Sequence, residues 1–440
     1  MMMEREREMN NSTVNTLRSL IELQDKVSLF GDLYGCNNDG ELNGLSRIAT
    51  LLSNTEFAAT QLFSAPGRTE LAENHTDHNL GKVLCAAVQN DTLAAVAKRS
   101  DGKVVIKSEG YTDRFEVHVD DLDLHPSELE TTTGLIRGVL AGIKEYGGDL
   151  GGFSANITSN VSVGSGLSSS ASFEVLIGTI ISELYNNGNI PPTKIAQISQ
   201  FAENKYFGKP CGLMDQTASA HGGILSIDFA DPEDINIQKV AFDLEATEYA
   251  LLVVETGSSH ADLTDAYASI PEEMKAVAKS LGAEVLRQTD KAELMRLLSS
   301  VRADLGDRAV LRALHFYQEN RRVDHMLESL KIDDFDGYLK SVGASAASSQ
   351  NILQNVLPPM IDGKEQGVSF ALGLSQLFFE EKKRGQARVH GGGFAGTIQA
   401  YVHHEDLEEY TELMNQILGP NAVQHLRIRH TGATAILDLP

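Results

Sequence analysis

The sharpest local signal in the sequence is Val163-Gly-Ser-Gly-Leu-Ser-Ser-Ser-Ala-Ser172, which joins a predicted strand at residues 153–158 to an apolar helix predicted over residues 171–185. Glycine allows the backbone to approach a ligand closely, and serine hydroxyls and backbone N–H groups donate hydrogen bonds without carrying a net charge. The following helix directs the positive end of its dipole at the same point. We therefore expect this loop to hold phosphate.

Other glycine-rich loops fit this stretch less well. A Walker A loop ends in Gly-Lys-Ser or Gly-Lys-Thr, and the stretch contains no lysine. A dinucleotide fingerprint has a third glycine, whereas Gly164-x-Gly166 is followed by Ser169 at that position. A flexible Ser/Gly linker is a further alternative, but an apolar helix is predicted to begin at once. The pattern favours a triphosphate loop.

A second segment is dense in polar groups: Ser64-Ala-Pro-Gly-Arg-Thr-Glu-Leu-Ala-Glu-Asn-His-Thr-Asp-His-Asn79. Its Pro-Gly pair predicts a turn that fixes the direction of Arg68. The short polar and ionisable side chains that follow suit the hydroxyl groups of a sugar. Two alternatives remain, a metal site made by His75, Asp77 and His78 and a solvated polar loop. No third or fourth spaced ligand supports the metal site.

A third segment is Ala202-Glu-Asn-Lys-Tyr-Phe-Gly-Lys-Pro-Cys-Gly-Leu-Met-Asp-Gln216. Its proline and glycine predict a constrained turn that presents Asp215. A carboxylate held in this way suits a general base or a group that orients a hydroxyl. The alternative is that Asp215 caps a helix.

The fourth segment is His390-Gly-Gly-Gly-Phe-Ala-Gly396, which lies between predicted strands at residues 388–389 and 397–402. Three successive glycines permit two backbones, or a backbone and a phosphate, to come into contact. Alone, this segment is weak evidence for a site.

Together, the four segments resemble the GHMP kinases and, within that superfamily, the galactokinase branch. The likeness spans roughly residues 62–440; the glycine loop is specific to the superfamily, and residues 65–79 and 210–216 agree with the branch. The resemblance implies a two-domain α/β (α+β) fold with ATP and sugar in the cleft between the domains. It also implies transfer of phosphate from ATP to the anomeric C1 hydroxyl of galactose.

The resemblance further implies a role for each site residue. Asp215 matches the catalytic aspartate and Arg68 its partner arginine, and Asp215 either removes the hydroxyl proton or orients the hydroxyl with Arg68. The implied ligand contacts are Gly164, Ser165, Gly166, Leu167, Ser168, Ser169 and Ser170 for ATP, Ser170 and Glu203 for Mg²⁺, and Asn74, His75, Asp77, Gly212 and Tyr267 for the sugar.

The sugar segment departs from the family pattern. Relatives usually carry Asn-Leu-Ile-Gly-Glu-His-Thr-Asp-Tyr, and this chain has Glu70-Leu-Ala-Glu-Asn-His-Thr-Asp-His78. Asn74 therefore replaces the glutamate that binds the C6 hydroxyl, and Glu73, one position early, is expected to point elsewhere. Because an amide can also donate, Asn74 admits a C6 carboxylate. A kinase for galacturonate or an amino sugar is the alternative function.

A non-catalytic sugar sensor that binds ATP and galactose is a third hypothesis, from another class of protein. Sensors among the relatives are disabled in the glycine loop. The run Gly166-Leu-Ser-Ser-Ser-Ala-Ser172 is complete in this chain. The sequence therefore favours an enzyme.

Composition limits the remaining possibilities. The 440 residues carry a formal charge of −24, and 42% are hydrophobic. This acidity argues against nucleic-acid binding, which needs clustered lysine and arginine. Cys36, Cys85 and Cys211 form no metal pattern and fit a reducing compartment, and no apolar run reaches membrane length. We expect a cytoplasmic protein without a membrane partner, and its oligomeric state stays open.

Three regions are predicted along the chain. Residues 1–60 form a helical extension, in which Ser12 or Thr13 is the expected start of a helix. Residues 61–245 form the N-terminal kinase domain, with strands at 83–88 and 92–98 joined by a turn at Asn90 and Asp91. Residues 246–440 form the C-terminal kinase domain.

Overall fold

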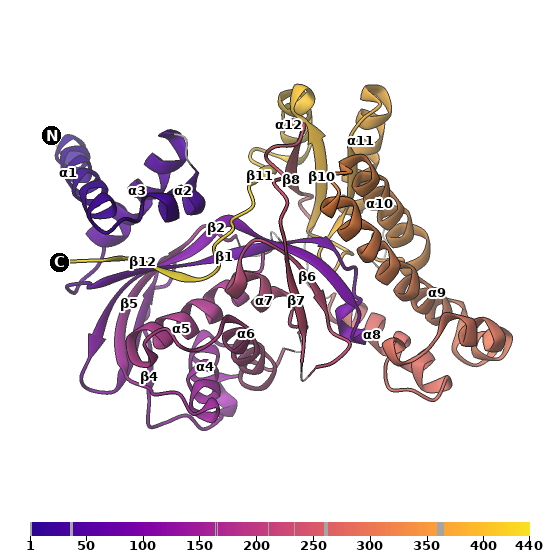
Figure 1. The fold of residues 1–440 in the computed structure, drawn as a ribbon, viewed down its shortest axis with the longest axis horizontal. Helices are drawn as coiled ribbons and strands as arrows, with labels where there is room; N and C mark the ends of the chain where they lie inside the picture. Colours follow the sequence, from indigo (N-terminus) through magenta and orange to yellow (C-terminus); the bar gives the residue numbers. More distant parts are fainter. Residues whose placement is uncertain are drawn as a thin grey trace.

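The computed structural model describes residues 2–35, 38–162, 164, 166–209, 211–232, 234–258, 263–358 and 365–440. Within these ranges the chain forms two β-sheets flanked by helices, so the predicted mixed α/β class is confirmed. Figure 1 shows the two sheets side by side, the first mostly from the earlier part of the chain and the second from the later part.

The first sheet has the strand order β12-β1-β2-β5-β3-β4, and β6 pairs with β2 while β7 pairs with β6. Its strands are β1 (Gln61–Ala72), β2 (Lys82–Arg99), β3 (Lys103–Ser108), β4 (Phe115–His118), β5 (Gly152–Ser159), β6 (Ile224–Asp228), β7 (Asn236–Val240) and β12 (Thr434–Asp438). The β3–β5 pair is parallel and the other pairs are antiparallel.

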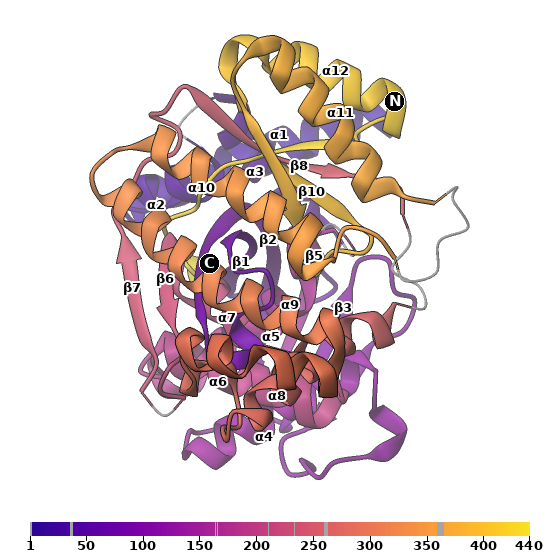
Figure 2. The same ribbon diagram turned by 90° about the vertical axis from the view of Figure 1, so that its right-hand side faces the viewer.

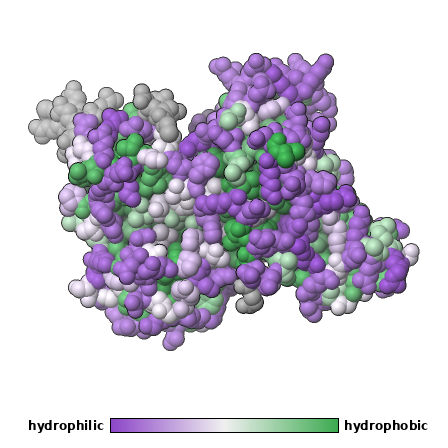
Figure 3. Space-filling view, viewed as in Figure 1, coloured by the Kyte–Doolittle hydropathy of each residue, from purple (hydrophilic) through white to green (hydrophobic). Residues whose placement is uncertain are grey.

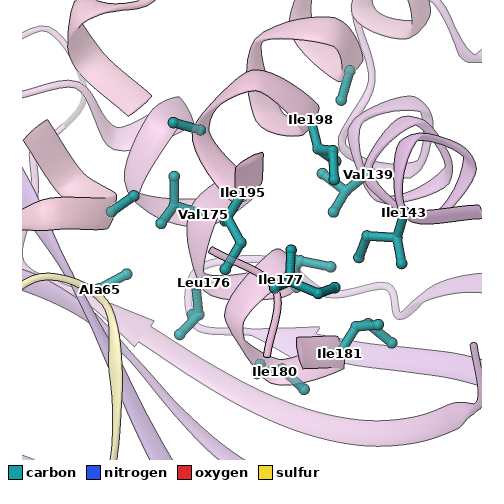
Figure 4. Close-up of a cluster of buried hydrophobic side chains, with 14 of the residues drawn as sticks. Ala65, Val139, Ile143, Val175, Leu176, Ile177, Ile180, Ile181, Ile195 and Ile198 are labelled. Atoms are coloured by element: carbon teal, nitrogen blue, oxygen red, sulfur yellow. The ribbon is translucent and has the colours of Figure 1, made fainter. Parts of the chain in front are cut away.

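Four helices cover one face of this sheet: α4 (Thr132–Tyr146), α5 (Ser169–Asn186), α6 (Pro192–Phe201) and α7 (Met214–His221). Helix α4 begins where the Thr131 side chain accepts a hydrogen bond from Gly134 N, and ends where Gly147 adopts a left-handed conformation. The apolar face of α5 packs between the sheet and the neighbouring helices (Figure 4). This packing fixes the N-terminal end of α5, which receives the glycine loop.

The opposite face carries the N-terminal extension, made of α1 (Met2–Leu23), α2 (Val27–Tyr34) and α3 (Asn38–Ser53). Leu17, Phe30 and Leu45 are buried there against Leu62 and Leu93 of the sheet. The predicted helical character is confirmed. The predicted helix start at Ser12 or Thr13 is wrong because α1 already begins at Met2. The glutamate, arginine and methionine residues that precede Ser12 have high helix propensity, so the helix extends back through them.

The second sheet has the order β11-β8-β10-β9. Its strands are β8 (Tyr249–Glu255), β9 (Gln386–His390), β10 (Thr397–His403) and β11 (Val423–Leu426), and its helices are α8 (Thr264–Ser280), α9 (Lys291–Lys331), α10 (Phe335–Ser348), α11 (Gly367–Lys382) and α12 (Leu407–Leu418). Helices α11 and α12 share a buried apolar cluster with one face of the sheet, and Figure 2 shows them crossing it.

Successive side chains of β8 point to opposite faces and pack against two different apolar clusters. Leu252 and Val254 pack toward α11 and α12, whereas Leu251 and Val253 face a cluster that includes Leu84 of β2 and residues of α9 and α10. Both faces of β8 are therefore buried. This second cluster holds the sheets in a fixed relation around the ends of β1 and β9.

The predicted boundary near residue 245 falls between β7 and β8, which belong to different sheets, and it stays a prediction. The end of the chain differs from the predicted domain of residues 246–440. Strand β12 pairs antiparallel with β1, with Leu62 opposite Leu437. Its Ile436 and Leu437 complete the apolar cluster under the N-terminal extension, which explains why the last strand returns to the first sheet.

Two predicted turns are wrong. Residues 83–98 lie in the single strand β2, because Asp91 is buried and paired with Arg47 at 2.7 Å instead of facing solvent. Pro66 and Gly67 lie inside β1, where the pairing register shifts between Pro66 and Arg68. A bulge, not a turn, therefore directs Arg68.

The face shown in Figure 3 is mostly hydrophilic, with apolar residues near the centre of the view. Among the described residues, no helix has both the length and the apolar character needed to cross a membrane.

Candidate active site

The glycine loop connects β5 to α5 in left-handed backbone conformations. Gly164 has φ 83° and Gly166 has φ 73°, which are values that favour glycine. A Cβ atom on Gly166 would lie 2.7 Å from His390 Nδ1 and 2.9 Å from Thr397 Oγ1. The loop is therefore held against β9 and β10 of the second sheet and is not a free linker. Ser165 lies outside the described residues.

The loop meets the predicted catalytic pair directly. Arg68 Nε donates to Asp215 Oδ1 at 2.7 Å and Arg68 Nη2 donates to Asp215 Oδ2 at 2.8 Å. Ser168 Oγ donates to the same Oδ2 at 2.6 Å. Arg68 also donates from its backbone N to the Leu167 carbonyl at 2.9 Å and from Nη1 to the Gly166 carbonyl. Hydrogen bonds therefore connect the glycine loop, the guanidinium of Arg68 and the carboxylate of Asp215 in one cluster.

Asp215 lies in the first turn of α7, one residue beyond Met214. The cap position of this helix is Leu213, so the capping alternative for Asp215 is wrong. Burial raises the pKa of Asp215, but the charge of Arg68 and the hydrogen bonds from Ser168 and Arg68 outweigh burial and hold that pKa below its usual value. The carboxylate is therefore ionised at neutral pH. Pro210, expected to shape the preceding turn, lies outside the described residues.

The predicted metal ligands are neighbours. Ser170 Oγ, in the first turn of α5, donates to Glu203 Oε1 at 3.2 Å. Glu203 is on the short π-helical segment Ala202–Phe207, and its other oxygen accepts from Gln216 Nε2 at 2.8 Å. Lys209 Nζ lies 3.3 Å from Oε1. A hydroxyl and a carboxylate beside a phosphate loop fit Mg²⁺, which keeps several waters and binds substrate phosphates.

Three predicted sugar residues gather at the end of β1. A Cβ atom on Gly212 would lie 1.6 Å from Asp77 Oδ2, so Asp77 occupies space that only glycine leaves open. His75 Nε2 lies 2.9 Å from the Gly392 carbonyl. Burial, and then the proximity of His78, lower the pKa of His75 to about 4, so its ring is neutral at pH 7 and Nε2–H donates.

Tyr267 approaches from α8. Its hydroxyl donates to the Gly393 carbonyl at 2.9 Å, and its ring stands edge-on to Phe394 at 5.5 Å. Backbone carbonyls of the triple glycine therefore accept hydrogen bonds from both His75 and Tyr267. This loop was only weak evidence for a site in the sequence analysis, because the partners of a glycine backbone come from distant parts of the chain.

The Asn74 side chain forms its hydrogen bonds with residues 345–355. Its side chain is fully buried and donates from Nδ2 to Ser349 Oγ at 2.6 Å, and its Oδ1 accepts from Asn355 Nδ2 at 3.3 Å. The amide expected to replace the family glutamate is hydrogen-bonded to a polar network beside α10. Its assignment to the sugar stays a prediction.

Glu73 was expected to point away from the sugar, and its exclusion from the sugar contacts stays a prediction. The side chain is buried, and burial and then the charges of Asp77 and Glu70 raise the pKa of its carboxyl well above its usual value. The exclusion assumed regular strand or helix alternation, but β1 ends at Ala72, and Asn74 and His75 have φ values of 46° and 68°. Asparagine tolerates this left-handed conformation, which was the available signal in the sequence.

His390 is a packing residue beside the site whose contacts were not predicted from the sequence. Its Nε2 lies 3.0 Å from Thr69 Oγ1 and its Nδ1 lies 3.0 Å from Thr397 Oγ1. Burial, and then the charges of Arg68 and Arg388, lower its pKa to about 3. The neutral ring packs between the strand that carries Arg68 and the glycine loop.

The alternatives for residues 64–79 are not supported. Arg68, Glu70 and Thr76 are buried, so the segment is not a solvated loop. Within the described ranges, no group of three or more histidine, cysteine, aspartate or glutamate side chains is placed to hold a metal ion, and His75, Asp77 and His78 do not form one.

Comparison with known proteins agrees with this architecture. Residues 134–223 match the GHMP kinases N terminal domain. A mevalonate kinase structure, 15% identical, covers 83% of this chain with a TM-score of 0.58, which supports the shared fold. The fold and the loop beside Arg68 and Asp215 define a small-molecule kinase of the GHMP class.

More specific matches involve the sugar segment. Residues 54–98 match the galactokinase galactose-binding signature. The chain is 30% identical to galactokinase of Streptomyces coelicolor over 83% of this chain and 91% of that protein, and 32% identical to galactokinase of Mannheimia succiniciproducens over 80% and 87%. Lactococcus lactis galactokinase complexed with galactose has a TM-score of 0.73 at 25% identity, covering 89% of this chain and 99% of that chain. The chain belongs to the galactokinase family.

Proposed function

We propose that this chain transfers the γ-phosphoryl group of ATP to the anomeric C1 hydroxyl of galactose, giving galactose 1-phosphate and ADP. The observation that carries the proposal is that Ser168 of the glycine loop and Arg68 hydrogen-bond the same carboxylate, that of Asp215. A phosphate at the loop would therefore lie beside the group that receives the acceptor hydroxyl. The galactokinase relatives and the galactose complex of a relative support galactose as that acceptor.

The loop supplies the binding site for the phosphates. Gly164 and Gly166 adopt conformations that bring the backbone close to a ligand, and α5 starts directly after Ser168. The residues assigned to ATP are Gly164, Ser165, Gly166, Leu167, Ser168, Ser169 and Ser170. Hydroxyls and the helix N-terminus stabilise negative charge on the transferring group as it develops.

Asp215 acts as an orienting group in this proposal. A carboxylate paired with Arg68 through two hydrogen bonds, with a lowered pKa, is a weak base for an alcohol proton. It is well suited to accept a hydrogen bond from the C1 hydroxyl and to hold the oxygen in line with phosphorus. The proton then leaves on the phosphate as the new P–O bond forms and the bond to ADP breaks.

Mg²⁺ belongs to the same proposal. Ser170 and Glu203 would hold it, and their 3.2 Å contact and the burial of Glu203 keep both groups at the phosphate end of the site. The ion supplies neutralisation of charge on the phosphate oxygens. Lys209, beside Glu203, restrains the carboxylate.

The sugar is assigned to the region between the end of β1 and the triple glycine. His75, Asp77, Gly212 and Tyr267 converge there from three separate parts of the chain, and Asn74 is retained as a predicted contact.

Free thiols at Cys85 and Cys211 support the proposal that the protein works in the reducing cytoplasm.

A coupled ADP-release assay with Mg-ATP tests the proposed reaction across galactose, galacturonate, galactosamine and N-acetylgalactosamine. We expect turnover with galactose. The variant Asp215→Asn keeps the shape of the side chain but loses the charge that pairs with Arg68, so kcat is expected to fall about a thousandfold while nucleotide affinity is largely retained. Wild-type protein without galactose turnover, or full activity in Asp215→Asn, would contradict the proposal.

A further inference from the structure

A cavity of about 510 Å³ lies between α3 of the N-terminal extension and the first sheet. Helix α3 forms one wall, and the ends of the parallel strands β3 and β5, with the residues that follow β3, form the other. None of the described residues assigned to ATP, Mg²⁺ or the substrate sugar lines it. Its volume falls within the range of roughly 300–1,000 Å³ that is usual for small-molecule sites. The cavity is therefore separate from the proposed active site and large enough for a ligand.

The wall made by β5 contains a buried amide with an unused acceptor. Asn156 is 6% exposed, and its Nδ2 donates to the Leu51 carbonyl and to Thr55 Oγ1, both at 3.2 Å. Within the described ranges no group donates to Asn156 Oδ1. A buried carbonyl oxygen without a donor is unfavourable. A ligand hydroxyl that enters the cavity would supply the missing donor.

The wall made by α3 adds polar groups of the same kind. Ser46 and Thr50 lie four residues apart on one face of α3, and Asn54 continues that face, because its backbone N–H donates to the Thr50 carbonyl at 3.2 Å. In the part of the chain that the structure describes, the side chains of these three residues form no hydrogen bond. Hydroxyl and amide groups can both donate and accept. Together with Asn156 they suit a ligand that carries several hydroxyl groups.

The charges around the cavity favour a ligand without net charge. Two cations line it, and each is already paired at 2.7 Å, Arg47 with Asp91 and Lys107 with Glu56. The carboxylate of Glu109 lines it as well. An anionic ligand would face this carboxylate without an unpaired cation among the described lining residues, and a cationic ligand would lie beside two cations. A neutral ligand avoids both unfavourable interactions.

An exposed aromatic ring completes the lining. Tyr111 is 58% exposed, and its ring stands edge-on to that of Phe115 with the ring centroids 5.4 Å apart. Its backbone N–H donates to the Ser108 carbonyl at 3.2 Å, which holds the residue at the end of β3. The face of an aromatic ring packs against the C–H groups of a sugar ring, and the tyrosine hydroxyl adds a polar tip. Aromatic side chains combined with a few placed polar groups are typical of small-molecule sites.

We propose that this cavity is a second binding site that takes a neutral saccharide, held by hydrogen bonds to Asn156 and α3 and by packing against Tyr111. The inference goes beyond the proposed function and does not depend on it, since the cavity shares no described residue with the proposed active site.

The fluorescence of a single introduced tryptophan tests the site, because the chain has no tryptophan of its own. Tyr111→Trp places an indole ring at the cavity. Titration with galactose, maltose and sucrose is expected to change its emission saturably for at least one of them, with a Kd of about 1 mM, which a few hydrogen bonds of ordinary strength provide. Tyr146→Trp, at an exposed tyrosine that ends α4 outside the cavity, is the matched control and should show no change.

A variant with a filled cavity gives the second comparison. Thr50→Phe, introduced into the Tyr111→Trp protein, adds bulk to the cavity wall and is expected to raise the Kd at least about tenfold. Ser53→Phe, on the same helix but outside the cavity, should leave the Kd unchanged. A Tm close to that of Tyr111→Trp shows that both variants keep the fold.

Three results would overturn the second site: no saturable response to any of the three saccharides, an unchanged Kd in Thr50→Phe, or a saturable response to inorganic phosphate in place of a saccharide. A response that Thr50→Phe removes while galactose turnover is retained in the ADP-release assay would support a site distinct from the active site. A saccharide response in a protein without galactose turnover would contradict only the kinase proposal.

Discussion

At the scale of single residues, the site depends on the fork geometry of Arg68. Two nitrogens of Arg68 bind the two oxygens of Asp215, and a third binds the Gly166 carbonyl. A lysine presents one point charge and cannot make this set of contacts. Arg68→Lys is therefore expected to lower kcat by about a hundredfold, measured in the ADP-release assay.

Arg384→Lys is the matched control for this substitution. Arg384 also binds both oxygens of a carboxylate, with Nε 2.6 Å from Asp406 Oδ2 and Nη2 3.0 Å from Oδ1, but it lies on the second sheet's periphery near α12. Its replacement should leave kcat unchanged. An equal loss of kcat in both variants would mean that Arg68→Lys lowers activity by destabilising the fold and not by changing the site.

At the scale of elements, the glycine loop is fixed by its contact with β9 and β10. Gly164→Ala and Gly166→Ala both place a side chain in the left-handed region, at a cost of roughly 1–2 kcal/mol. An added Cβ meets nothing within 4 Å at Gly164, but approaches His390 within 2.7 Å at Gly166. We therefore expect Gly166→Ala to raise the KM for ATP clearly more than Gly164→Ala does.

Steady-state kinetics with varied ATP, together with the Tm of each variant, checks this expectation. The Tm separates loss of fold from displacement of the loop. Similar KM values for ATP in the two alanine variants would show that His390 and Thr397 do not set the loop position.

At the scale of the whole molecule, buried neutral histidines tie stability to pH. Burial is the main cause that lowers the pKa from 6.5 to about 4 for His75 and His315 and to about 3 for His390. Unfolding exposes rings that take up protons between these values and 6.5, so stability is complete above pH 6.5 and falls as the pH drops below it. The free energy of unfolding falls by about 1.4 kcal/mol per pH unit for each ring.

Thermal unfolding between pH 7.5 and 4.5 tests the sign and the source of this slope. We expect Tm to fall with pH, and His315→Gln to flatten the curve, because a glutamine can replace hydrogen bonds to Ser348 and the Asn74 carbonyl without titrating. His118→Gln, at a partly exposed position on β4, is the control. A His315→Gln curve parallel to wild type would contradict the assignment.

The reaction class was predictable from the sequence, because the glycine loop, Arg68 and Asp215 lie in local segments that resemble those of the GHMP kinases. The mixed fold class was also predictable from the spacing of apolar residues in α4, α5 and β8. The strand β1 and the single long β2 were not predicted, since Pro66, Gly67, Asn90 and Asp91 are turn formers in isolation. Burial and the Asp91–Arg47 pair override that local preference.

The arrangement of the sugar side was not predictable from the sequence and follows from tertiary contacts. The direction of the Asn74 side chain follows from two left-handed residues and from hydrogen bonds to residues more than 270 positions away. The contacts of His390 with Thr69 and of Gly212 with Asp77 likewise join distant segments. Local residue types set what each group can do, but the direction in which a side chain points depends on long-range packing, which no single stretch of sequence contains.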